Sequence, residues 1–138
     1  MDLSKVDYVA RADEGEWMTV TDPLGAELVD EVTKKPARLK LVGLDSKRYR
    51  DKNREIQDRR IEKMRRNKPT TSKLHETETR DLIAHCVLDW EEFYSDGQPL
   101  ECNPENVRML FEKVPYIQLQ ADNFIGDRAN FMKGSSSP

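Results

Sequence analysis

The sequence is poor in the residues that build metal centres. Its 138 residues include only two histidines, His75 and His85, and two cysteines, Cys86 and Cys102. No CxxC or HxxxH spacing joins them, and neighbours such as His85 and Cys86 point about 100° apart on a helix. We therefore expect neither a metal site nor a cofactor. So few cysteines also fit a reducing compartment, where they need not be bonded.

Long apolar runs, nucleophile elbows and phosphate-binding loops are missing as well. No run approaches the roughly 20 apolar residues that cross a bilayer, and the acidic, mixed N-terminus does not predict a signal peptide. The six glycines are scattered, without GxGxxG or GxxxxGK[ST] spacing, and no GxSxG motif occurs. The carboxylates around Trp90 are typical of a strand's solvent face. We expect a soluble intracellular protein that is not an enzyme.

Charge, in contrast, is abundant and unevenly distributed. Charged residues make up 36% of the chain, whose net charge is −3. The segment 46–68 has eleven Lys or Arg and four Asp or Glu, a net charge of +7, so the rest of the chain has −10. Such a segment is suited to nucleic acid, or to an acidic protein surface that includes another copy of the chain.

Apolar periodicity predicts one α+β domain over residues 1–133, followed by a flexible tail at 134–138. Alternating side chains on either side of a Asp-Pro-Leu-Gly turn predict a small N-terminal antiparallel sheet within about 16–43. Its strands are expected near 16–21, 26–32 and 37–43.

A long basic helix is predicted over about 46–67, with Asp45 or Ser46 as its N-cap. Glu and Arg residues four apart support an exposed helix. A thin apolar stripe is expected to pack against the rest of the fold. That stripe consists of Tyr49, Ile56, Ile61 and Met64.

A mostly helical half is predicted over about 72–133. Asp96-Gly97 indicates a short hairpin within it. Asn103 followed by Pro104 is typical of a helix start, with Asn as the cap and Pro in the first turn. The helices are expected near 72–87, 104–114 and 115–133.

Four aromatic residues in this half have two interpretations. At their spacings the default is a place in the core, and the alternative is a surface that contacts a partner. A seven-residue step on the last helix favours a partner-facing seam as the minority interpretation. These residues are Trp90, Phe93, Phe124 and Phe131.

The second half also resembles the tail assembly chaperones of long-tailed, lambda-like bacteriophages (siphoviruses). The motifs follow one another in the order and spacing of that family, and the resemblance covers roughly residues 38–133. They are Leu39–Arg50 before the basic helix, Trp90–Phe93, Asp96–Leu100, Cys102–Val107, Leu110-Phe111 before Pro115, and Phe124–Met132.

The resemblance implies a non-enzymatic role in virion assembly, in the cytoplasm of the infected bacterial host. Chaperones of this kind transiently bind the tape measure protein, a long and largely helical ruler. They keep it soluble, help to recruit tail tube protein subunits, and are not retained in the mature virion. The split charge of this chain also fits an oligomer in which copies associate head to tail.

Two alternatives remain open from the sequence. One is a nucleic-acid-binding phage accessory protein that acts through the basic helix 46–68, and the other is a structural tail terminator or connector. The four acids among the bases make nucleic acid the weaker interpretation. We expect the helix to offer arginines to the acidic body of another copy or of the partner, so that their replacement by Glu changes self-association. These are Arg59, Arg60, Arg65 and Arg66.

Overall fold

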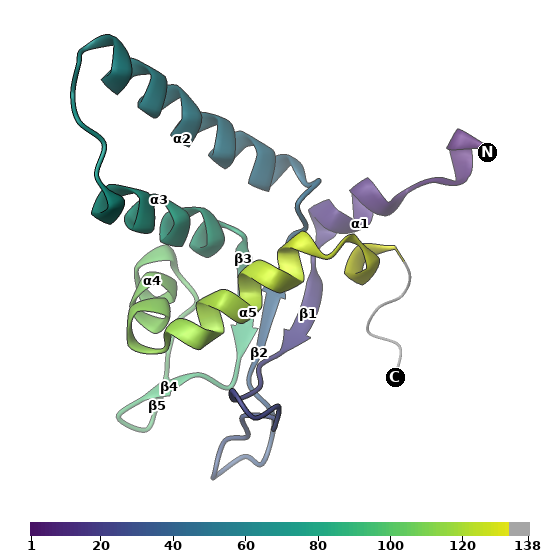
Figure 1. Cartoon of the computed structure of the whole chain (residues 1–138). Coiled ribbons are helices and arrows are strands. Elements are labelled where there is room, and N and C mark those ends of the chain that lie inside the picture. Colours follow the sequence, from purple (N-terminus) through teal and green to yellow (C-terminus); the bar gives the residue numbers. More distant parts are fainter. Residues whose placement is uncertain (133–138) are drawn as a thin grey trace.

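A three-stranded antiparallel sheet lies in the middle of the structure, and helix α5 runs across one face of it (Figure 1). The computed structural model describes residues 1–132, so the tail expected at 134–138 lies outside the described residues. The α+β class is confirmed. The described chain forms η1 (Leu3–Lys5), α1 (Tyr8–Glu14), β1 (Glu16–Thr19), β2 (Arg38–Leu41), α2 (Lys47–Arg65), α3 (Ser72–His85), β3 (Val87–Glu91), β4 (Tyr94–Ser95), β5 (Gln98–Pro99), α4 (Pro104–Lys113), α5 (Pro115–Gly126) and η2 (Arg128–Phe131).

The sheet has the order β1-β2-β3, which differs from the predicted one. Its third strand was expected at 26–32, but that segment forms only the isolated bridges Thr21↔Glu27 and Val29↔Pro36. Asp30 explains part of this, because its carboxylate accepts hydrogen bonds from two backbone amides and folds the segment into a turn. The third strand is instead β3, far along the chain, where Trp90 pairs with Leu39.

The predicted helix over 72–87 is accordingly two residues too long, since α3 ends at His85. Val87 and Trp90 are buried on the strand that follows, and their burial in the sheet outweighs the helical periodicity. The hairpin at Asp96-Gly97 is confirmed: both residues have a positive φ, 50° and 77°, as a two-residue hairpin turn requires.

One face of the sheet is apolar and holds the core. Met18, Leu39 and Trp90 lie side by side on it, and Ala121 and Ile125 of α5 join the same cluster of buried side chains. Each fully buried side chain of this size contributes about 1.5–3 kcal/mol. The apolar face of α5 is therefore explained by the core of this chain.

The last predicted helix, 115–133, is wrong beyond Gly126, and residue 133 lies outside the described residues. α5 begins at Pro115 and ends at Gly126. Asp127 then accepts a hydrogen bond from the amide of Ala129 and starts the separate turn η2, which returns Phe131 to the core. The local capping side chain, which the helical pattern did not take into account, ends the helix.

Helix α1 was not predicted, and it packs where β2 ends. Gly43 donates its N–H to the carbonyl of Ala12 at 3.0 Å. A Cβ at position 43 would lie 2.9 Å from Ala12 and 3.0 Å from the ring of Phe131. Only glycine therefore permits this close approach of α1, the end of β2 and η2.

Candidate interaction surface

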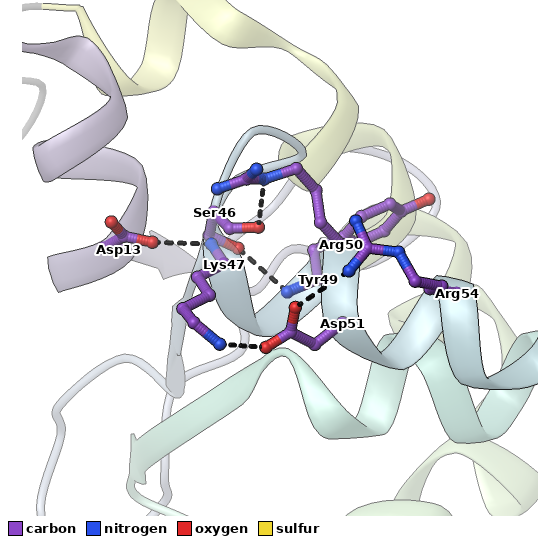
Figure 2. Close-up of polar contacts among 7 residues, drawn as sticks. All are labelled: Asp13, Ser46, Lys47, Tyr49, Arg50, Asp51 and Arg54. Carbon is purple, nitrogen blue, oxygen red and sulfur yellow. Dashed lines mark hydrogen bonds and ion pairs between the residues drawn. The ribbon is translucent and has the colours of Figure 1, made fainter.

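Polar contacts hold the N-terminus of helix α2 to the body of the chain (Figure 2). Ser46, one of the two predicted caps, is completely buried, and its hydroxyl accepts a hydrogen bond from the amide of Tyr49 at 3.1 Å. Its carbonyl accepts a further bond from Arg50 Nε at 3.3 Å. The cap residue thus fixes where the helix begins and in which direction it leaves.

Segments far apart in the sequence hold this end of α2 in place. The amide of Lys47 donates to Asp13 Oδ1 of α1 at 2.7 Å, as Figure 2 shows. Arg128 of η2 donates to Asp45 Oδ2 at 2.6 Å, and this hydrogen bond holds the pKa of Asp45 below its usual range. Sequence patterns did not indicate these contacts, because they join the two termini of the described chain to its middle.

The middle of α2 contacts α3 through a short face. Ile56 is the buried residue of α2. One turn further on, Arg60 donates from Nε to Glu78 Oε1 of α3 at 3.0 Å, and the Glu78 side chain is only 9% exposed. Nearer the start of α2, Arg48 donates from Nε to the carbonyl of His85, the last residue of α3, at 2.6 Å. The two helices are therefore joined by this hydrogen bond and by the shielded ion pair between Arg60 and Glu78.

The far end of α2 does not pack against the fold as expected. Of the predicted stripe, Ile56 is buried and Tyr49 half-buried, but Ile61 is 56% exposed and Met64 70% exposed. At about 100° per residue, Ile61 lies about 140° around the helix from Ile56. The stripe was too wide for one contact with α3, and its far members face solvent.

The four arginines singled out from the sequence lie on different sides of α2. Arg60 is committed to Glu78 within the chain. Arg65 and Arg66 are exposed and lie 3.7 and 2.9 Å from the carboxylate of Glu62, respectively. Arg59 is exposed. Their role in self-association stays a prediction, and the structure does not gather them into one patch.

The four aromatic residues lie in or against the core. Trp90 is 7% exposed, donates its indole N–H to the carbonyl of Leu100 at 2.8 Å, and lies with its ring centroid 4.8 Å from that of Phe93. Phe131 is buried, and Phe93 and Phe124 are partly buried against the core. A partner therefore reaches at most one side of Phe93 and of Phe124.

The minority interpretation of a seam along one helix from Phe124 to Phe131 is wrong, because α5 ends between them. The two rings instead contact each other edge to face, with centroids 5.7 Å apart. Such a pair is typical of a packed core.

The two thiols near the start of β3 are poor nucleophiles at neutral pH. Burial raises the pKa of Cys86 to about 12 and that of Cys102 to about 11. Burial, with Arg48 nearby, lowers the pKa of His85. Both thiols are therefore protonated at neutral pH, the form that is a weak nucleophile.

Within residues 1–132, no helix combines the length and the apolar character that crossing a membrane requires. No family model matches this chain, and neither a curated protein nor a solved structure shows significant similarity to it.

Proposed function

We propose that this chain is a tail assembly chaperone of a long-tailed bacteriophage. In this role it binds the tape measure protein transiently in the host cytoplasm, keeps it soluble, and helps to recruit tail tube subunits. It acts by binding and not by catalysis, and it leaves before the virion is complete. The resemblance over residues 38–133 names the family, and the exposed surface of α2 supports a binding role.

The observation on which the proposal rests is the poor burial of α2. The helix has 19 residues and buries one of them, while its far end exposes Ile61 and Met64. Most helices in proteins are stabilised by packing an amphipathic face. A long helix with exposed basic and apolar side chains, held firmly at one end, is suited to contact a helical partner that exposes apolar surface itself.

The motifs of the resemblance have structural roles in the body that holds α2. Asn103 caps α4 through a hydrogen bond from the amide of Asn106 at 2.8 Å. Asn130 donates to the carbonyl of Phe124 at 3.0 Å, and Arg128 binds Asp45 at the start of α2. These contacts give a physical reason for the motif residues, which hold the body of this chain together.

The test is co-expression with a coiled-coil segment of a tape measure protein, followed by a pull-down. We expect the segment to stay in the soluble fraction and to copurify with the chain. A segment that is equally soluble alone, and that forms no complex, would contradict the proposal.

A second candidate is nucleic-acid binding through 46–68, which the exposed Arg54, Arg59, Arg65 and Arg66 favour. Fluorescence anisotropy with duplex DNA separates the two. Micromolar binding at physiological salt that weakens steeply as salt is added would support the second candidate, because released counterions drive such binding. A terminator or connector would instead persist in purified virions, where a chaperone is absent.

A further inference from the structure

The exposed side of α2 contains a stripe of basic and apolar residues in a regular order. Its members follow one another at spacings of four, three, four and three, and at about 100° per residue they fall within an arc of about 80°. All are exposed. The stripe, called the cationic–apolar stripe below, consists of Arg50, Arg54, Gln57, Ile61 and Met64.

The acidic residues of α2 form a separate stripe, centred about 110° further around the helix. Much of their charge is already engaged within α2. Asp51 pairs with Lys47, and Glu62 pairs with Arg66 at 2.9 Å and with Arg65 at 3.7 Å. Arg54 of the cationic–apolar stripe also lies 3.8 Å from Asp51, so it shares part of its charge with the acidic stripe. The pairs with Lys47, Arg65 and Arg66 lie outside the cationic–apolar stripe, which therefore keeps a net positive charge.

Apart from Arg50, which donates to the carbonyl of Ser46, the stripe has little part in the packing of this chain. α2 contacts α3 through another side of the helix, which contains Ile56 and Arg60. The Arg54 side chain is 70% exposed, as is Met64. Packing with α3 therefore does not account for apolar side chains at 61 and 64.

We propose that the cationic–apolar stripe is the docking surface for one amphipathic helix of a partner protein. Spacings of three and four are those at which one helix packs along another. The stripe spans 14 residue steps, which is about 21 Å or four turns. This inference rests on the proposed function and specifies its contact surface.

The order of residues along the stripe specifies the partner's chemistry. Arg50 and Arg54 lie toward the anchored end, and Ile61 and Met64 toward the free end. The complementary helix has acidic side chains opposite the two arginines and apolar side chains opposite 61 and 64. Its polarity along α2 is therefore fixed by charge.

A nucleic acid matches this surface less well. Phosphates would form ion pairs with Arg50 and Arg54, but they would make no favourable contact with Ile61 and Met64. A helix with both acidic and apolar side chains would contact the arginines and the apolar residues of the stripe together.

The probe is a fluorescent designed helical peptide of about three heptads. Its core positions are Glu in one half and Leu in the other, and its remaining positions are residues that favour a helix. A matched control peptide has Lys in place of each Glu. We expect the whole chain to bind the acidic peptide in an anisotropy titration. We expect the Lys peptide to bind about tenfold more weakly or worse, since two charge contacts become repulsive.

Variants of the chain then locate the surface. Arg54→Glu and the pair Ile61→Asp/Met64→Asp should each raise the Kd for the acidic peptide about tenfold. Arg59→Glu makes the same charge change about 180° from the centre of the stripe, so we expect its Kd to change less than about twofold. All altered side chains are exposed, and circular dichroism checks that each variant is folded.

The proposal would be overturned if the acidic peptide did not bind, or if Arg54→Glu and Arg59→Glu had equal effects. Tighter binding of duplex DNA than of the acidic peptide would overturn it in favour of a nucleic-acid surface. The proposed function has an independent outcome. If the tape measure segment copurifies equally with wild type and stripe variants, the function stands and the stripe is wrong. If the peptide binds but no segment does, the stripe stands and the function is wrong.

Discussion

Helices α2 and α5 differ in how much of their surface the core of the chain buries. α5 has 12 residues and buries Ile117, Ala121 and Ile125, whereas α2 has 19 residues and buries only Ile56. The core of the chain accounts for these three residues of α5, whose Leu119 is 61% exposed, whereas most of α2 has no place in the core. The comparison shows that α5 is held by the core of the chain and that most of α2 is exposed to solvent.

Side-chain truncation gives the largest expected contrast between the two helices. Ile125→Ala on α5 should lower the free energy of unfolding by about 2–5 kcal/mol, because it leaves a cavity in the core. Ile61→Ala on α2 should change it by less than about 0.5 kcal/mol, since the side chain is exposed. Urea denaturation followed by circular dichroism measures both. Similar losses would mean that the far end of α2 belongs to the core.

Ion pairs should differ within α2 in the same way. Arg60→Ala leaves the shielded carboxylate of Glu78 without its partner, and we expect a loss of about 1–3 kcal/mol. Arg66→Ala removes an exposed pair with Glu62 and should cost less than about 0.5 kcal/mol. The double variant Arg60→Ala/Glu78→Ala should regain much of the first loss in the same denaturation experiment. Equal effects of Arg60→Ala and Arg66→Ala would show that α2 and α3 are not paired in solution.

The two ends of the α2–α3 pair have caps of the same kind in different surroundings. Ser46→Ala at the buried start of α2 should cost about 1–2 kcal/mol, near the top of the range for caps. Thr71→Ala at the exposed start of α3 removes a similar hydrogen bond to the amide of Leu74 and should cost about 0.5–1 kcal/mol. Thermal unfolding compares the loss of stability in the two variants. A larger loss for Thr71→Ala than for Ser46→Ala would argue against an anchored start of α2.

Acid should weaken the anchor of α2 by a smaller amount. The hydrogen bond from Arg128 lowers the pKa of Asp45 in the folded chain, so this contribution is fully present above the unfolded pKa, near 4. It is lost as the pH falls through the lower folded pKa. The stability difference between wild type and Asp45→Asn should therefore be constant from about pH 5 to 8 and shrink below about pH 4. A difference that grew on acidification would contradict this assignment.

Features set by neighbouring residues were predictable from the sequence. Asn103-Pro104 begins α4, Asp96-Gly97 turns a hairpin, and Ser46 begins α2. Each depends on a side chain or a φ preference that acts within a few residues.

Features set by distant parts of the chain were not predictable in this way. Val87 and Trp90 form a strand because β2 is available beside them, and no local pattern shows that edge. The exposure of Ile61 and Met64 depends on how short the contact between α2 and α3 is. The arrangement of the stripe itself was present in the helical spacing, but its exposure required the structure.

Photo-crosslinking tests most directly that α2 presents a surface to a helical partner. Ile61→p-benzoylphenylalanine, co-expressed with the tape measure segment and irradiated, should give a covalent adduct between the two proteins. The same replacement at Arg59, on the other side of α2, should give little adduct. A complex that forms without an adduct from position 61, or with an equal adduct from position 59, would contradict the account.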